Sequence, residues 1–160
     1  MTTPSNTDLI AQAWRVFASR DAERIAALFT PDAEWRAPRH NATAVALRHA
    51  DHMIGAAAIA RFIATDMHRL FADVTITFRG IYGDGAAVVV EERMRATLPG
   101  GRPYELDYCF VFELLDGRIH RVREYMDTLS GWHQVFGTAP PNHPTAAPHG
   151  SAPDAASSPP

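Results

Sequence analysis

The sequence predicts an α+β fold in which helices come first and a run of long strands follows. Apolar residues recur at helical spacing from Leu9 to Ala18 and again from Ile59 to Leu70. Beyond Leu70 the apolar period changes to about two residues, which is typical of strands. This order predicts a curved, mostly antiparallel sheet that wraps the N-terminal helices into a cone-shaped barrel around a cavity.

The first half of the chain contains the expected helices. Polar residues 6–8 offer N-cap oxygens to the first helix. Asp21 predicts the start of a short second helix that reaches Phe29 and ends at the breaker sequence 30–32. We expect a strand over 33–38, an irregular excursion over 39–54 and a third helix after Gly55.

Four strands separated by turn sequences are expected in the second half. Glycine-containing turns at 83–85, 99–101 and 116–117 divide the alternating segments, and Asp116-Gly117 is a strong hairpin signal. The expected strands are 74–82, 86–97, 103–115 and 118–126, and a short closing helix is expected over 128–136.

Composition limits the classes of protein that fit. The chain has 160 residues, a net charge of −3 and a single cysteine, Cys109. We therefore expect no disulfide framework, no nucleic-acid partner and no membrane span, and a cytoplasmic location.

Residues 138–160 hold seven of the twelve prolines. This predicts one domain over 1–137 and a disordered tail over 138–160.

Two stretches of the chain resemble a SnoaL-like domain. The first joins Ala27-Leu28-Phe29 to Pro31-Asp32-Ala33-Glu34-Trp35, with Gly55 before an apolar helix. The second joins Leu115-Asp116-Gly117-Arg118-Ile119 to Arg123-Glu124-Tyr125-Met126-Asp127. Over 8–137 the chain thus resembles the nuclear transport factor 2-like superfamily, which includes ketosteroid isomerase, limonene epoxide hydrolase and the polyketide cyclases. The resemblance implies a homodimer, but the fold alone does not fix the chemistry.

The resemblance to ketosteroid isomerase lacks two of three catalytic roles. The position of the general base is occupied by Ala37, and that of the oxyanion-binding tyrosine falls near Ala13. The position of the protonated aspartate falls near Tyr108, which can still donate a hydrogen bond.

Other relatives point to other charged residues. The final aspartate of limonene epoxide hydrolase aligns with Glu124, while its arginine and partner aspartate fall at Glu91 and Arg93, with the charges exchanged. The polyketide cyclases place an acid/base aspartate at Asp127. Because Asp127 precedes a predicted helix, an N-cap role is the alternative for it.

Strand alternation supplies a candidate site. Glu91 and Arg93 share one face of their strand, and we assign that face, together with Tyr108 and Glu124, to the cavity. Two carboxyl groups that share one arginine can have different pKa values, so that one acts as a base and the other as an acid. Arg93 would then polarise a substrate oxygen, and Tyr108 would donate to it. The alternative is that Glu91 and Arg93 form ion pairs on the solvated or dimer-facing side, where a one-residue slip would place them.

Apolar residues of the helices and strands are expected to line the cavity and bind the substrate. His49 and His52 make a poor metal site, so no metal is expected. The expected substrate-binding residues are Trp14, Phe17, Trp35, Phe62, Leu106, Phe110 and Met126.

The sequence therefore predicts a small acid/base enzyme that needs no cofactor and acts on an apolar small molecule, as an isomerase, cyclase or dehydratase. The alternatives are a non-catalytic small-molecule-binding or dimerisation module and, among enzymes, an epoxide hydrolase. The expected homodimer would form through the outer face of the sheet, where Arg121, Arg123 and Tyr125 are expected to lie.

Overall fold

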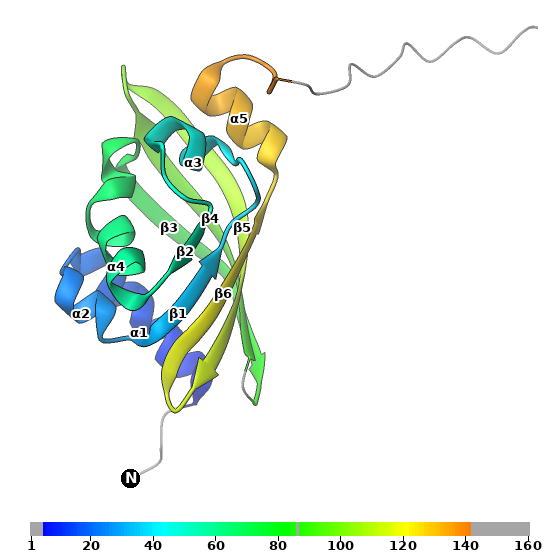
Figure 1. Ribbon diagram of the computed structural model, residues 1–160. Coiled ribbons are helices and arrows are strands. Elements are labelled where there is room, and N and C mark those ends of the chain that lie inside the picture. Colours follow the sequence, from blue (N-terminus) through cyan, green and yellow to red (C-terminus); the bar gives the residue numbers. More distant parts are fainter. Residues whose placement is uncertain (1–4, 86, 142–160) are drawn as a thin grey trace, which may run out of the picture.

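A curved sheet of six strands is packed against helices on its concave side (Figure 1). The computed structural model describes residues 5–85 and 87–141, and the strand order is β2-β1-β6-β5-β4-β3. The elements are α1 (Asn6–Ser19), α2 (Ala22–Ala26), β1 (Phe29–Arg36), α3 (Ala42–Leu47), β2 (His52–Ile54), α4 (Ala56–Ala64), the 3-10 helix η1 (Asp66–Arg69), β3 (Ala72–Asp84), β4 (Ala87–Leu98), β5 (Arg102–Leu115), β6 (Arg118–Met126) and α5 (Thr128–Phe136).

The predicted α+β architecture is confirmed. Strands β3 to β6 pair antiparallel in sequence order, and β1 and β6 run parallel. The sheet is curved but does not close on itself, so the cone is an open one. The unbroken register between β4 and β5 fixes which side chains of these strands share a face.

The segment expected to be irregular, 39–54, is ordered. Asn41 is buried, its side chain accepts a hydrogen bond from the Ala44 amide at 3.0 Å and donates to the Pro38 carbonyl at 2.9 Å, and it thereby caps α3. Strand β2 then pairs with β1, with Met53 opposite Trp35. The sequence analysis missed both elements because they are too short to show a period.

Strand β1 begins earlier than predicted, at Phe29, and the second helix ends at Ala26. The expected breaker, Pro31, lies inside β1, where the register with β6 shifts between Phe29 and Glu34. A bulge of this kind accommodates a residue that has no amide hydrogen to donate.

The core forms between the concave face and the helices. Trp14 of α1 makes edge-on contacts with Phe17, Phe78 and Phe110 at ring-centre distances of 5.5–5.6 Å. Among the described residues, no helix is long and apolar enough to cross a membrane. From residue 142 onward, the predicted tail over 138–160 lies outside the residues that the structure describes.

Candidate active site

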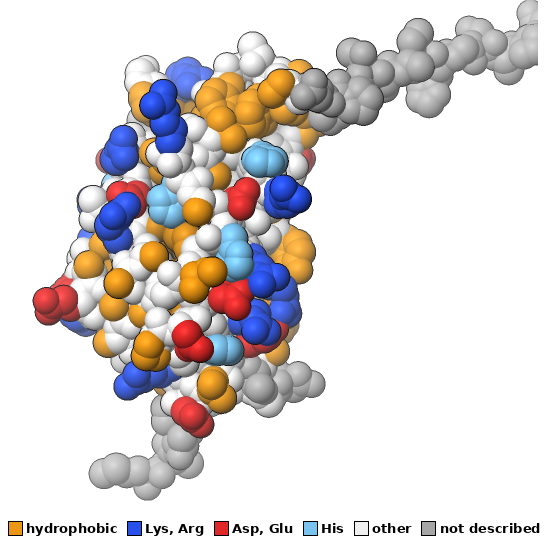
Figure 2. Space-filling model, in the orientation of Figure 1, with side chains coloured by type: hydrophobic (Ala, Val, Ile, Leu, Met, Phe, Trp, Pro, Cys, Tyr) orange, Lys and Arg blue, Asp and Glu red, His pale blue; other side chains and the backbone are white. Residues whose placement is uncertain are grey.

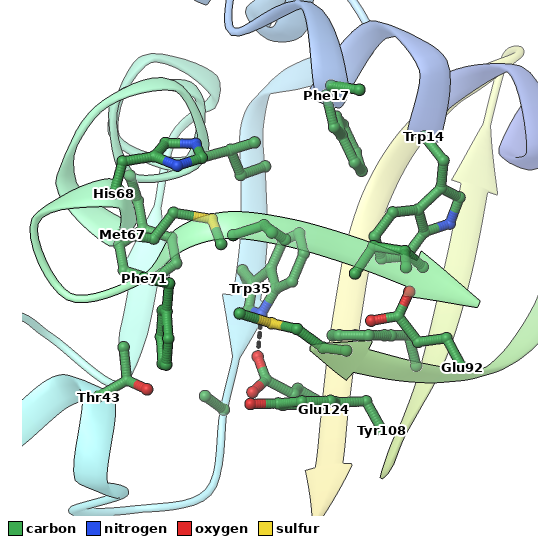
Figure 3. Close-up of a pocket in the computed structure, with 18 of the residues that line it drawn as sticks. Trp14, Phe17, Trp35, Thr43, Met67, His68, Phe71, Glu92, Tyr108 and Glu124 are labelled. Atoms are coloured by element: carbon green, nitrogen blue, oxygen red, sulfur yellow. Dashed lines mark hydrogen bonds between the residues drawn. The ribbon is translucent and has the colours of Figure 1, made fainter. Parts of the chain in front are cut away.

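A cavity of about 860 Å³ lies between the concave face of the sheet and the helices α1, α3 and α4 (Figure 3). Its size is within the range of small-molecule sites. Five of the seven residues predicted to bind substrate line it: Trp14, Phe17, Trp35, Phe62 and Phe110. These aromatic walls offer dispersion contacts and exclude water.

Leu106 and Met126 do not line the cavity, which corrects that part of the prediction. Leu106 is buried where the sheet meets α5, and its Cδ2 lies 3.4 Å from the position that a Cβ would take at Gly131. Met126 ends β6 and packs against the core from its edge.

The strand register brings two glutamates to the concave face. Glu92 of β4 is directly opposite Tyr108 of β5, and Phe110, two residues further along β5, is opposite Glu124 of β6. All four side chains line the cavity. Since neighbouring strands lie about 4.8 Å apart, the two glutamate backbones are separated by two strand spacings, about 10 Å, plus the offset along β5. A molecule in the cavity can therefore contact both carboxyl groups.

Glu91 and Arg93 lie on the convex face, so the prediction that they meet Glu124 in the cavity is wrong. Arg93 Nε donates to Oδ1 of Asp107 at 2.6 Å, and its Nη1 donates to Oε1 of Glu105 at 2.8 Å. The side chain of Glu91 is exposed. Side chains alternate along β4 as predicted, but the set that contains Glu92 faces the cavity, and the set that contains Glu91 and Arg93 faces outward. The prediction missed Glu92 because it assigned the wrong set to the cavity.

The surroundings of Glu92 hold a proton on its carboxyl group. The residue is only 2% exposed, and no described residue bonds its Oε2. Burial, with a smaller contribution from the negative charge of Glu124, raises the pKa of Glu92 to about 8. At neutral pH Glu92 is therefore mostly a neutral acid that can donate.

Glu124 is partly exposed to the cavity and has one fixed partner. The indole Nε1 of Trp35 donates to Oε2 of Glu124 at 2.9 Å (Figure 3). Burial raises the pKa of Glu124 to about 7, and the hydrogen bond from Trp35 acts in the opposite direction by favouring the ionised form. Glu124 therefore exchanges its proton readily near neutral pH.

A tyrosine pair borders the two carboxyl groups. The hydroxyls of Tyr104 and Tyr108 are 2.7 Å apart, both rings are buried, and Tyr108 faces the cavity. Burial raises the pKa of Tyr104 to about 12 and that of Tyr108 well above its ordinary value. Tyr108 therefore stays protonated and can donate a hydrogen bond.

Asp127 lies outside the cavity and caps a helix. Its Oδ1 accepts from the Ser130 amide at 2.9 Å at the start of α5, and its side chain is exposed. The structure therefore supports the capping interpretation. Ala37, at the position of the isomerase base, does line the cavity but has no acid to contribute.

The two histidines considered as metal ligands have separate partners. Nε2 of His52 is 3.0 Å from Oε2 of Glu34, and Nε2 of His49 is 3.8 Å from Oδ2 of Asp66. In the part of the chain that the structure describes, no three His, Cys, Asp or Glu side chains group as metal ligands would.

Comparison with known proteins identifies the family. The model of the SnoaL-like domain matches residues 10–122, so the chain belongs to the SnoaL-like family. A search of curated proteins finds no match.

Solved structures share the fold at low sequence identity. An NTF2-like protein from Burkholderia pseudomallei is 20% identical with a TM-score of 0.72, covering 83% of this chain and 99% of its own. TerC, co-crystallised with polyporic acid, is 24% identical with a TM-score of 0.69, covering 83% and 98%. A ketosteroid isomerase-like protein from Catenulispora acidiphila, in complex with trimethylamine, is 18% identical with a TM-score of 0.63, covering 84% and 94%. These similarities establish the fold alone.

Proposed function

We propose that this protein is a small acid/base enzyme of the isomerase or cyclase type that acts on an apolar molecule in the cavity. The observation that carries the proposal is the pair Glu92 and Glu124. Both carboxyl groups face one aromatic-walled cavity, and both have pKa values raised toward neutrality, to about 8 and about 7. Strongly shifted carboxyl groups in a cleft are typical of proton-transfer sites.

The surroundings of the two carboxyl groups assign the role of base to Glu124 and that of acid to Glu92. Glu124, the group that ionises first and accepts a hydrogen bond from Trp35, removes a proton from carbon beside a carbonyl group. Glu92, still protonated, donates a hydrogen bond or its proton to the oxygen where negative charge develops. Tyr108 is a second donor. Reprotonation elsewhere gives an isomer, attack of the carbanion on a second carbonyl gives a ring, and loss of hydroxide gives a dehydrated product.

Two similar structures support a small-molecule ligand. Polyporic acid was co-crystallised with TerC, and trimethylamine is in the complex of the Catenulispora protein. We extend to this chain the expectation that its cavity also takes a small organic molecule. The proposed reaction itself requires only an acid and a base.

The test uses two adjacent glutamates, one inside and one outside the cavity. Deuterium uptake by a panel of apolar ketones, such as tetralones and decalones, is followed by proton NMR in heavy water. We expect Glu92→Gln and Glu124→Gln each to reduce the enzyme-dependent rate by about 10²-fold or more. Glu91→Gln, one residue away on the convex face, is the matched control and should retain the wild-type rate.

Equal losses in Glu91→Gln and Glu92→Gln would contradict the proposal. Ketones that bind in the cavity without enzyme-dependent exchange would favour the alternative, a non-catalytic binding module. The epoxide hydrolase alternative loses support because Glu91 and Arg93 of its aligned charge set face outward.

Homodimerisation stays a prediction. On the convex face Tyr125 is 52% exposed, while Arg121 and Arg123 both pair with Glu113. Light scattering at increasing protein concentration tests it, and a monomer throughout would contradict it.

A further inference from the structure

The cavity has a cationic rim that the proposed chemistry does not use. Arg15 and Arg20 of the α1 region line the cavity and are also exposed, so they lie where it opens to solvent. His68 lines the same region, and Arg20 is close enough for its charge to contribute to lowering the pKa of His68. Figure 3 shows His68 on the opposite side of the cavity from Glu92 and Glu124.

Arg20 is held in place without losing its charge to a partner. It follows α1 as its C-cap residue in the left-handed region, with φ of 57°, and its Nε donates to the Ala64 carbonyl at 3.2 Å. That bond fixes the side chain between α1 and α4 and leaves the two terminal nitrogens for another acceptor. Within the described ranges, 5–85 and 87–141, neither Arg20 nor Arg15 forms an ion pair with a carboxylate.

The charges that line the cavity are unequally distributed between its ends. Apart from the two glutamates, Asp73 is the one lining carboxylate among the described residues, and the lining also contains two arginines, Arg15 and Arg20. Burial, more than the charge of Arg20, lowers the pKa of His68, so this ring is mainly neutral at pH 7. The rim therefore attracts an anion, whereas the negative charge of Glu124 repels one from the inner end.

We propose that the substrate is an elongated aromatic molecule with one carboxylate, which Arg15 and Arg20 bind at the rim while the reacting end reaches Glu92 and Glu124. Arginine suits this role because its planar fork matches the two oxygens of a carboxylate. The unequal charge then sets the orientation of the substrate in the cavity. The proposal rests on the proposed function for the position of the reacting end, but the preference for an anion is measurable without turnover.

The test compares two fluorescent probes that differ only in charge. Pyrenebutyrate carries a carboxylate, and pyrenebutanol has a hydroxyl in its place. In fluorescence titrations at low salt, the wild-type protein should bind pyrenebutyrate about three- to tenfold more tightly. The double variant Arg15→Gln/Arg20→Gln should bring this ratio close to one. Its unchanged affinity for pyrenebutanol would show that the cavity remains intact.

Two further variants make the result specific. Arg24→Gln removes an exposed arginine of α2 that does not line the cavity, and it should keep the wild-type ratio. Glu92→Gln should also keep the ratio, which separates this inference from the proposed proton transfer. Equal affinity of the wild type for both probes, or a preference that survives in the double variant, would overturn the inference. The inference would also be overturned if Arg24→Gln reduced the preference for pyrenebutyrate as much as the double variant does, because the preference would then depend on overall charge.

Discussion

Glu91 and Glu92 are neighbours in the chain, but they belong to opposite faces of one sheet. On the convex face, acidic residues of β5 lie beside arginines of β4, and the hydrogen bond from Arg93 lowers the pKa of Asp107. On the concave face, Glu92 has no cationic partner among the described residues, and burial raises its pKa to about 8. Acidic side chains such as Glu105 and Asp107 are therefore paired anions on the convex face, whereas Glu92 is a neutral acid on the concave face.

This difference separates a surface of ion-paired side chains from a cavity wall whose carboxyl groups have shifted pKa values. Ion pairs between exposed side chains contribute little to stability because water screens them. A carboxyl group in an apolar cavity lowers the stability of the fold once it ionises, yet it gains a pKa that suits proton transfer at neutral pH. Figure 2 shows acidic, basic and histidine side chains close together on the surface of the molecule.

The largest expected effect on stability comes from removing the buried acid. In the unfolded chain Glu92 ionises at its ordinary pKa of 4.5, whereas the folded chain keeps the proton up to about 8. Its contribution to stability is therefore fully present below about pH 4.5 and is lost as pH rises through 8. In Glu92→Gln this loss is absent. The free energy of unfolding of the variant minus that of the wild type should therefore increase by on the order of 4 kcal/mol from about pH 4 to about pH 9.

Urea unfolding at the two pH values measures this gain. Glu91→Gln is the control, because its side chain lies in water on the convex face, and it should follow the wild-type curve. Parallel pH dependences in Glu92→Gln and the wild type would show that Glu92 is not held neutral by the fold.

A smaller effect is expected from Trp35→Phe. The substitution keeps an aromatic wall but removes the N–H that favours the ionised form of Glu124, so the pKa of Glu124 should rise. A hydrogen bond to a charged group contributes about 1.5–3 kcal/mol. The rate of deuterium exchange at mildly acidic pH should therefore fall by about tenfold, and the acidic limb of the pH profile should move upward.

Trp14→Phe is the matched control for Trp35→Phe. Trp14 also lines the cavity, but among the described residues its Nε1 has no hydrogen-bond partner. If both variants shift the profile equally, the effect comes from the shape of the cavity and not from the bond to Glu124.

The smallest effect is expected on the convex face. Arg93→Gln removes the bonds to Asp107 and Glu105, but water replaces them. The midpoint of urea unfolding should change only slightly, and raising the salt concentration should reduce the difference further. A large, salt-independent loss would show that this face has a role beyond ion pairing.

The sequence allowed the fold to be predicted more fully than the site. Long periodic segments gave β6 and α5 with the observed bounds. The short elements α3 and β2 depend on contacts that a period does not report: the local capping by Asn41 and the pairing of β2 with β1.

The site was mispredicted by one residue along β4. Glu92 shares its face with Val90, Met94 and Ala96, all apolar, whereas Glu91 shares its face with Arg93 and Arg95. Apolar neighbours mark the buried face, so the signal for Glu92 was present in the sequence. The resemblance to epoxide hydrolase gave priority to the charged neighbours instead. The pairing of Trp35 with Glu124 joins residues 89 apart, and no local pattern predicts it.

The central claim is that Glu92 and Glu124 titrate near neutral pH inside the cavity, with Glu124 ionising before Glu92. Carbon NMR of the glutamate carboxyl groups, titrated in the wild type and assigned with Glu92→Gln and Glu124→Gln, tests it most directly. We expect one resonance to titrate at about 8 and another at about 7, and each to disappear with its own substitution. Titration of both groups near the ordinary value of 4.5 would contradict the account.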